Sequence, residues 1–275
     1  MRKTLFGLLL LAPAIASAAD NHCSHSAPRE LALDLAGVKT VRVETHQHDV
    51  RLRAAPGTRH VLQGRACASQ PEWLADLTLT QERQGDTLVV RARREREGGL
   101  SNLFGNHYAR LELSGTVPDH LPVQLVVGSG DGLLEGAASA SADVGSGDAG
   151  LRGIRGAVTA KVGSGDIEVD GAGSLKVLAI GAGDGSARNT GGKGEVGSIG
   201  SGDCELDGAH GDVKIGSIGS GDADLRNVSG AVRVDSIGSG DLDVRGAGSL
   251  SVGSVGSGDV RHRDVRGAID LPRKR

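Results

Sequence analysis

Gly219-Ser-Gly-Asp222 leads into Ala223-Asp-Leu-Arg226, and nineteen residues later Gly238-Ser-Gly-Asp241 leads into Leu242-Asp-Val-Arg245. This tetrapeptide, once in the variant form Gly-Ala-Gly-Asp, recurs through the second half of the chain. It ends at Asp131, Asp148, Asp166, Asp184, Asp203, Asp222, Asp241 and Asp259, which are 17 to 19 residues apart. A period this short is too small for a pair of helices and matches one coil of a stacked β-solenoid.

Apolar residues follow each aspartate at fixed offsets. Asp166 leads Ile167 and Val169, and Asp241 leads Leu242 and Val244. Glycine-rich linkers lack such periodic β-branched residues, so the disordered interpretation is rejected. Aromatic residues make up 1% of the chain. The core must therefore consist of thin layers of Val, Ile, Leu and Ala.

These observations predict an all-β protein with about eight coils of 18–19 residues over residues 123–270. A single coil cannot bury its own apolar residues. Coils stacked about 4.8 Å apart hydrogen-bond to one another and enclose a continuous aliphatic core.

The tetrapeptide itself is expected to form the corner of each coil. Glycine permits a positive φ or a close backbone approach that a Cβ would obstruct. The aspartate can accept hydrogen bonds from N–H groups of its own turn, as in an Asx-turn. The expected ladder of structural turn residues is Gly147, Asp148, Gly165, Asp166, Gly202, Asp203, Gly221, Asp222, Gly240, Asp241, Gly258 and Asp259.

Calcium binding is an alternative use of the same aspartates, because stacked carboxylates repel one another unless they are hydrogen-bonded or neutralised. All eight, from Asp131 to Asp259, are weak candidate ligands for Ca²⁺. Calcium-binding β-rolls use a nonapeptide with a longer glycine–aspartate spacing, two copies per coil. The present motif occurs once per coil, so the structural role is preferred and no resident cofactor is expected.

The stretch before the repeats, residues 19–122, is β-rich but irregular. Segments such as Thr40–Val43 and Asp49–Arg53 alternate apolar and polar residues, as strands with one buried face do. We expect this region to cover one end of the solenoid. The other end finishes in a basic tail, residues 271–275. Open strand edges favour association, so we expect a monomer with a tendency toward end-to-end contact.

Export is predicted from residues 1–18. Arg2 and Lys3 precede an apolar run and a small-residue cleavage site, which is typical of a signal peptide, and the run is too short for a transmembrane anchor. Its removal leaves 29 basic against 34 acidic residues. This acidic balance argues against a nucleic-acid partner. The expected location is the periplasm, the cell surface or the medium.

Three cysteines would remain in an oxidising compartment. Cys23 and Cys67 could pair and tie the N-terminus to the first strands. Cys204 follows the aspartate of its repeat, where other coils carry Ile167 or Leu242, so we expect a buried, inert thiol.

Metal binding and catalysis are two further possible roles of the polar residues. His22, Cys23, His25, His46 and His48 could form a metal site, but surface histidines are favoured. His46 and His48 are two apart and would share one face of a strand. Polysaccharide lyases and hydrolases also use parallel β-helices. Their clefts need long loops, which coils this uniform do not offer. No catalytic residue is therefore expected.

The serial Gly-Ser-Gly-Asp units, together with Thr116–Leu125 and the N-terminal segment, resemble the bacterial "putative adhesin" β-strand-repeat families, including the head GIN-type domains. The resemblance covers about residues 30–270. It implies a right-handed parallel β-helix, export, and an adhesive or envelope role without defined catalytic residues. The expected function is a noncatalytic, adhesin-like or scaffold protein with an unidentified envelope or surface partner. The alternatives are a calcium-binding β-roll-like protein and a polysaccharide-acting enzyme.

Overall fold

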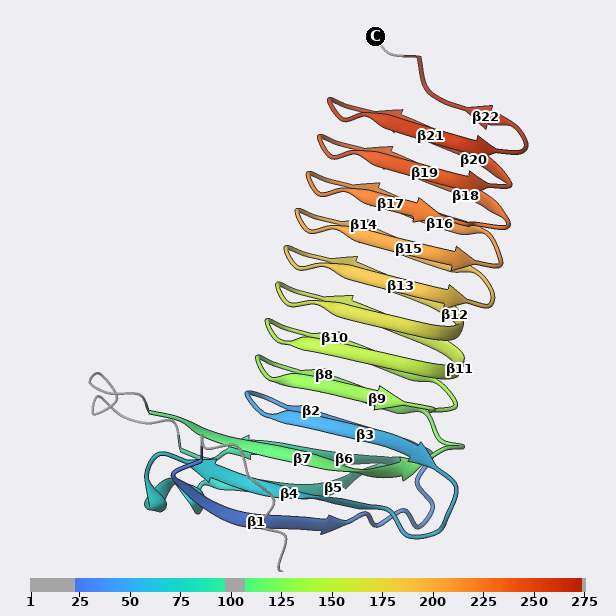
Figure 1. Ribbon diagram of the computed structural model, residues 1–275. Helices are drawn as coiled ribbons and strands as arrows, with labels where there is room; N and C mark the ends of the chain where they lie inside the picture. The colour runs from blue at the N-terminus through green and yellow to red at the C-terminus, as the bar shows by residue number, and fades with distance from the viewer. Residues whose placement is uncertain (1–22, 97–106, 274–275) are drawn as a thin grey trace, which may run out of the picture.

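The structure is a computed structural model that describes residues 23–96 and 107–273. The predicted signal peptide, residues 1–18, lies outside these residues, as do His22, Lys274 and Arg275. Nearly all of the regular structure is β, with one short 3₁₀ turn, η1 (Pro71–Leu74). Within residues 23–96 and 107–273, no helix is long and apolar enough to cross a bilayer. The parallel β-solenoid of about eight turns is confirmed (Figure 1).

Each coil contributes one strand to each of two faces. The aspartate face consists of the strands that follow the Gly-Ser-Gly-Asp corner, and the opposite face consists of those that precede it. The aspartate face contains β9 (Asp131–Glu135), the first parts of β11 (Asp148–Val162) and β12 (Ile167–Ile180), β13 (Gly185–Thr190), β15 (Cys204–Ala209), β17 (Ala223–Arg226), β19 (Leu242–Ala247) and β21 (Val260–Val265). The opposite face contains β8 (Val123–Val127), β10 (Ala140–Val144), the last parts of β11 and β12, β14 (Gly194–Ile199), β16 (Val213–Ile218), β18 (Ala231–Ile237), β20 (Ser249–Val255) and β22 (Ile269–Asp270).

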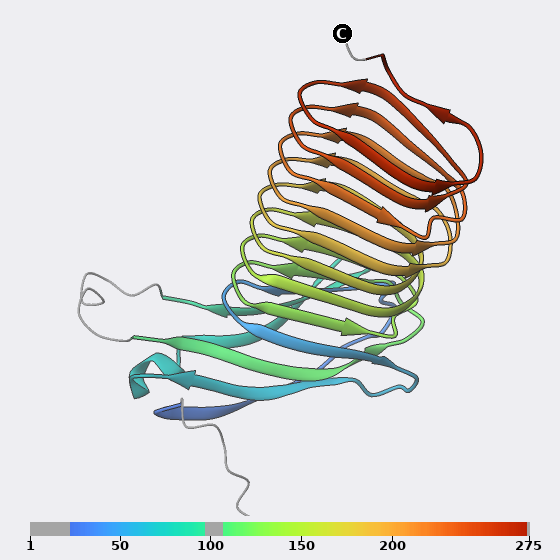
Figure 2. The ribbon, with the colours of Figure 1, turned by 45° about the horizontal axis from the view of Figure 1, so that its top comes forward.

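Equivalent residues stack in register along the solenoid, and this builds the core. One buried column on the aspartate face runs from coil to coil through Leu134, Leu151, Val169, Ala187, Leu206, Leu225 and Val244. With the C-terminal end tilted toward the viewer, the coils are seen as a stack of similar loops (Figure 2). Each coil thus buries its apolar residues against the coils above and below.

The solenoid begins earlier in the chain than the first Gly-Ser-Gly-Asp. β2 (Thr40–Thr45) and β3 (Asp49–Ala55) form a coil beneath β8 and β9 and pair with them in parallel. The repeat pattern predicts that the solenoid begins at residue 123 and that this segment belongs to the N-terminal region. Parallel stacking instead begins at residue 40, and the chain leaves the stack after β3 and returns at β8. The corner of this coil has the sequence His46-Gln-His-Asp49 in place of Gly-Ser-Gly-Asp, so the coil cannot be recognised from the repeat motif.

The remaining N-terminal strands extend both faces beneath this first coil. On the aspartate side β3 is followed by β7 (Ala109–Pro118), β4 (Val61–Ala68) and β1 (His25–Ala32). On the opposite side β2 is followed by β6 (Thr87–Arg94) and β5 (Leu77–Gln84). β7 and β6 are parallel to the coil above, and the strands beyond them are antiparallel (Figure 1).

Side chains link the two outermost strands of this N-terminal end. Arg29 on β1 donates to the carbonyl oxygens of Leu77 and Leu74, at 2.9 and 2.5 Å. Gln81 on β5 donates to the carbonyl oxygen of Ala32 and accepts the N–H of Asp34. These bonds join the ends of the two faces, so the N-terminal region closes this end of the stack.

The C-terminal end differs because, within the described residues, no further coil lies beyond β21 and β22. Here His262 is in register with Val244 but is exposed, and Arg261 and Arg263 flank it. A polar side chain therefore replaces the apolar one at the end of a core column. Charged residues on an open edge disfavour further strand addition. The expectation of a monomer with a tendency toward end-to-end contact stays a prediction.

The second corner of each coil needs a residue in the left-handed region. Glycine fills this position in five coils, with φ between 60° and 81°. Asn189, Asn227 and Asp264 fill it in the others, with φ of 58°, 54° and 56°. Asn and Asp tolerate this conformation better than other non-glycine residues. Asn227 also donates through Nδ2 to Oδ1 of Asp207 in the preceding coil, at 2.7 Å.

We predict that Asn227→Gly is tolerated and that Asn227→Val is not. Both variants lose the bond to Asp207, but glycine adopts the left-handed conformation freely, whereas a β-branched residue there costs about 1–2 kcal/mol. Urea unfolding of the two variants beside the wild type measures the difference. Equal free energies of unfolding for the two variants would contradict the assignment of this corner.

Candidate functional site: the aspartate ladder and its groove

The aspartates of the corners form a hydrogen-bonded ladder between coils. Oδ1 of each aspartate accepts the backbone N–H of the aspartate one coil further along. The recorded N···O distances are 3.1 Å for Asp49–Asp131, 3.2 Å for Asp148–Asp166, 2.9 Å for Asp166–Asp184, 2.8 Å for Asp184–Asp203, 2.8 Å for Asp203–Asp222, 2.7 Å for Asp222–Asp241 and 2.9 Å for Asp241–Asp259. Asp148 departs from this pattern, because its N–H donates to the carbonyl oxygen of Gly130 at 3.3 Å.

This ladder corrects the expectation that each aspartate bonds within its own turn. At the corner of Gly163, Ser164 and Gly165, which precedes Asp166, the three N–H groups donate to carbonyl oxygens of the coil below. The aspartate N–H that follows is the donor left for a side chain, and the carboxylate of the neighbouring coil reaches it. The aspartate thus connects coils rather than shaping one turn. Asp49 is the first rung, and sequence reasoning missed it because its corner lacks glycine.

The glycine before each aspartate is required by the closeness of the coils. A Cβ built on Gly221 would lie 1.8 Å from the carbonyl oxygen of Gly202. The equivalent distances for Gly147, Gly165, Gly202, Gly240 and Gly258 are 1.8–1.9 Å. None of these glycines has a positive φ. Close approach, and not unusual backbone torsion, therefore explains this half of the expected turn ladder.

A groove of about 700 Å³ runs along the aspartate face beside the ladder. It spans the coils from Asp49 to Glu205. Eight carboxylates and two arginines line it: Asp49, Asp131, Asp148, Asp166, Asp184, Asp203, Glu168 and Glu205, with Arg51 and Arg152. The groove is therefore strongly acidic, as the composition of the repeats implies.

Neighbouring arginines neutralise part of this charge. Glu168 pairs with Arg152 at 3.5 Å and also with Arg188 from the next coil. Asp131 lies at the lower end, where burial and then the carboxylates of Asp49 and Asp148 raise its pKa above the usual range. Exposed pairs of this kind contribute about 0–1 kcal/mol each to stability. These ion pairs therefore influence the net charge of the groove more than the stability of the fold.

The candidate metal ligands do not converge. Across residues 23–96 and 107–273, no three His, Cys, Asp or Glu side chains are arranged to hold a metal ion. The ladder commits Oδ1 of Asp203, Asp222 and their equivalents to backbone N–H groups. One carboxylate oxygen of each rung is thus already used in the contact between coils.

The histidine group is dispersed. Cys23 is bonded to Cys67, and His25 is exposed on β1. His46 and His48 were expected on one face of a strand but lie at a corner, where they replace the two glycines of the repeat. His46 is exposed there, while His48 is fully buried.

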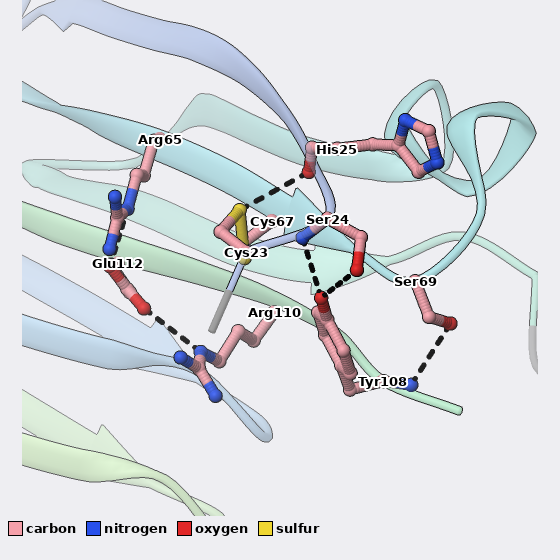
Figure 3. The surroundings of a disulfide bond; sticks show 9 residues. All are labelled: Cys23, Ser24, His25, Arg65, Cys67, Ser69, Tyr108, Arg110 and Glu112. Atoms are coloured by element: carbon pink, nitrogen blue, oxygen red, sulfur yellow. Dashed lines mark hydrogen bonds and ion pairs between the residues drawn. A yellow bond between two sulfur atoms is a disulfide. The ribbon is translucent and has the colours of Figure 1, made fainter. Parts of the chain in front are cut away.

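A disulfide joins Cys23 to Cys67 across 44 residues (Figure 3). Beside it the Tyr108 hydroxyl accepts the backbone N–H of Ser24 at 2.7 Å and donates to the side-chain hydroxyl of Ser24 at 2.9 Å. Glu112 on β7 accepts from Arg65 on β4 and from Arg110, at 2.7 and 2.9 Å. These contacts hold the start of the described chain against β4 and β7.

Cys204 is a buried free thiol in the core of the solenoid. Burial and, to a lesser extent, the charge of Asp203 raise its pKa to about 12. Because the thiolate is the reactive form, this cysteine is chemically inert in the folded protein.

The described aromatic residues of the N-terminal region offer little open ring surface. The Arg94 guanidinium lies 4.6 Å from the Trp73 ring centre, and the His107 ring packs at 5.4 Å in an edge arrangement. Phe104 lies outside the described residues. Tyr108 faces the chain segment that carries Cys23 (Figure 3).

Comparison with solved structures finds proteins to which this chain is similar. A putative adhesin from Parabacteroides distasonis is 13% identical, with a TM-score of 0.55; the match covers 87% of this chain and 97% of that one. A putative adhesin from Parabacteroides merdae is 12% identical, with a TM-score of 0.42 and coverage of 87% and 97%. A putative lipid binding protein from Parabacteroides distasonis is 14% identical, with a TM-score of 0.43 and coverage of 89% and 97%.

Sequence comparison gives a firmer assignment. No curated protein matches the chain. The Toastrack DUF4097 family matches residues 38–261, which begin just before β2 and end within β21. This range includes the interrupted first coil as well as the Gly-Ser-Gly-Asp repeats. The chain belongs to the Toastrack DUF4097 family.

Proposed function

We propose that this protein is an exported, noncatalytic interaction protein that acts as an adhesin-like or scaffold component of the cell envelope. The observation that carries the proposal is the uniformity of the coils, which display the same polar groups at a regular spacing. Similar coils bring no long loop over the aspartate face that would build an enclosed cleft. The fold shared with putative adhesins supports this assignment without identifying a ligand.

The groove beside the aspartate ladder is the surface to which we assign the contact. Its acidic lining favours a partner that carries positive charge, and many weak contacts repeated along the stack would add up through multivalency. Binding should therefore weaken as ionic strength rises. Replacing Glu168 and Glu205 by glutamine removes groove charge without touching the rungs of the ladder.

The test is binding of the full chain without its signal peptide to a glycan array and to purified envelope fragments. The same glycans are assayed for hydrolysis and lyase cleavage. We expect saturable, salt-sensitive binding that the Glu168→Gln, Glu205→Gln variant weakens several-fold. Glu195→Gln on the opposite face is the matched control, because its exposure is similar. Reproducible turnover of a glycan, or no binding to any probe, would overturn the proposal.

A further inference from the structure

His48 occupies the position that glycine holds before the aspartate in every later corner. Gly130 stacks directly above it, and a Cβ on Gly130 would lie 2.3 Å from the carbonyl oxygen of His48. At the first corner no coil lies below, so a side chain can be accommodated. The imidazole fills this space beneath the stack and is 0% exposed.

The imidazole also bonds to the strand beneath. The backbone N–H of Leu111 on β7 donates to Nδ1 of His48 at 3.2 Å. An Nδ1 that accepts must be unprotonated, so the proton of the neutral ring is on Nε2. Nε2 is buried without a hydrogen-bond partner. The ring thus takes the place of a backbone carbonyl as the acceptor for the Leu111 N–H.

Protonation would reverse this contact. A proton on Nδ1 would face the Leu111 N–H, so two donors would oppose each other and a charge would be buried. We propose that His48 is an acid-sensitive link that releases β7, β4 and β1 from the first coil of the solenoid when it is protonated.

The charged groups around the ring determine the pH at which this happens. The pKa of His48 falls from 6.5 to about 4, mainly because the ring is buried; His46 and, less strongly, the Arg94 guanidinium on β6 act in the same direction, whereas Asp49 and the backbone of Gln47 oppose them. Asp131 lies in the corner above. On β7, Arg110 and Glu112 flank Leu111 and pair with each other.

The direction in which stability changes with pH follows from this lowered pKa. Because the pKa is lower in the folded state, the contribution of His48 to stability is complete above pH 6.5. It is lost as the pH falls toward 4 and is constant below that. The shift from 6.5 to about 4 corresponds to a change of up to about 300-fold in the opening equilibrium, since each pH unit is a factor of ten. The upper coils keep their own backbone pairing and should remain stacked.

The test is hydrogen exchange of the full chain without its signal peptide between pH 7 and pH 3.5, corrected for intrinsic rates. In the wild type, protection of residues 109–118 should fall at least tenfold more than that of residues 204–252. His48→Asn offers Oδ1 as a non-titrating acceptor for Leu111, so its protection should not change between pH 6.5 and 4. His46→Asn, at the exposed neighbour, should still lose this protection on acidification, at a slightly higher pH because His46 no longer lowers the pKa of His48. The same loss in His48→Asn as in the wild type would overturn the proposal.

If His48→Asn does not fold, NMR of the wild type decides the question. The imidazole of His48 and the amide of Leu111 should titrate together with a midpoint near pH 4. A ring that titrates above pH 6, or a Leu111 amide that does not follow it, would also overturn the proposal.

Discussion

Gly221→Ala should destabilise the protein by about 3 kcal/mol or more, although it adds a single methyl group. The new Cβ would lie 1.8 Å from the carbonyl oxygen of Gly202, and the obstructing atom is backbone that its own hydrogen bonds hold in place. Overpacked side chains typically cost about 1–3 kcal/mol, and here no rotamer change can relieve the clash. The coils must separate locally, which weakens the contact between the lower and upper parts of the stack.

Thermal and urea unfolding of Gly221→Ala measure this effect. Because repeats interact with their nearest neighbours, we expect a second, earlier transition as well as a lower overall stability. Ser220→Ala is the matched control, since Ser220 is exposed at the same corner and its replacement should change stability by about 0.5 kcal/mol or less. If Gly221→Ala unfolds like Ser220→Ala, close approach is not the reason for glycine at this position.

Loss of the disulfide should be the other large effect. A cross-link between residues 44 apart in sequence corresponds to about 4 kcal/mol by the loop-entropy relation. We therefore expect Cys23→Ser, Cys67→Ser to lower the stability of the N-terminal strands by about this amount, while the coils beyond Asp148 change little. Hydrogen exchange followed by region separates the two parts of the molecule.

Reduction of the wild type provides the control for this prediction. A reductant should lower the protection of β1 and β4 in the wild type and have no effect on the double variant. Cys204 does not confuse the comparison, because its thiol is buried and largely unreactive. A double variant whose β1 and β4 are as well protected as in the oxidised wild type would show that the cross-link is dispensable.

The regular part of this fold could be predicted because its physics repeats. Each aspartate from Asp131 onward marks the corner of one coil, and the apolar residues after it predict a strand with a buried face. The elements that escaped prediction are those where the repeat is interrupted. The first coil at 40–55 is separated from its neighbours by the strands between Val61 and Pro118. Spacing along the sequence cannot reveal such a coil.

The sequence did not predict that the aspartate side chains bond to the next coil, and the reason is different. An Asx-turn and a bond to the next coil need the same residue at the same corner, so a local motif cannot distinguish them. The choice depends on which backbone N–H is left without a carbonyl, and only the stacked arrangement determines that. The left-handed conformation of Asn189 and Asn227 could in principle be predicted, because these residues occupy the position of the second-corner glycine and asparagine tolerates a positive φ.

The candidate site could be predicted from the sequence only in part. Composition alone indicated an acidic surface and a core without aromatic residues. It did not indicate that the carboxylates line one continuous groove, because the side of the coil on which they lie follows from the in-register stacking. The sequence favours a surface histidine over a metal ligand at His48, but the residue is buried, because no coil lies below the first corner.

The most direct test of the ladder compares Asp222→Asn with Asp222→Ala by urea unfolding, each with and without Ca²⁺. Asparagine can still accept the N–H of Asp241 through Oδ1, and it removes one of a row of like charges. We predict that Asp222→Asn stays within about 0.5 kcal/mol of the wild type, that Asp222→Ala loses about 1–2 kcal/mol, and that Ca²⁺ changes none of the three. Equal losses in both variants, together with a wild type that Ca²⁺ stabilises, would show that the aspartates bind cations instead of connecting the coils.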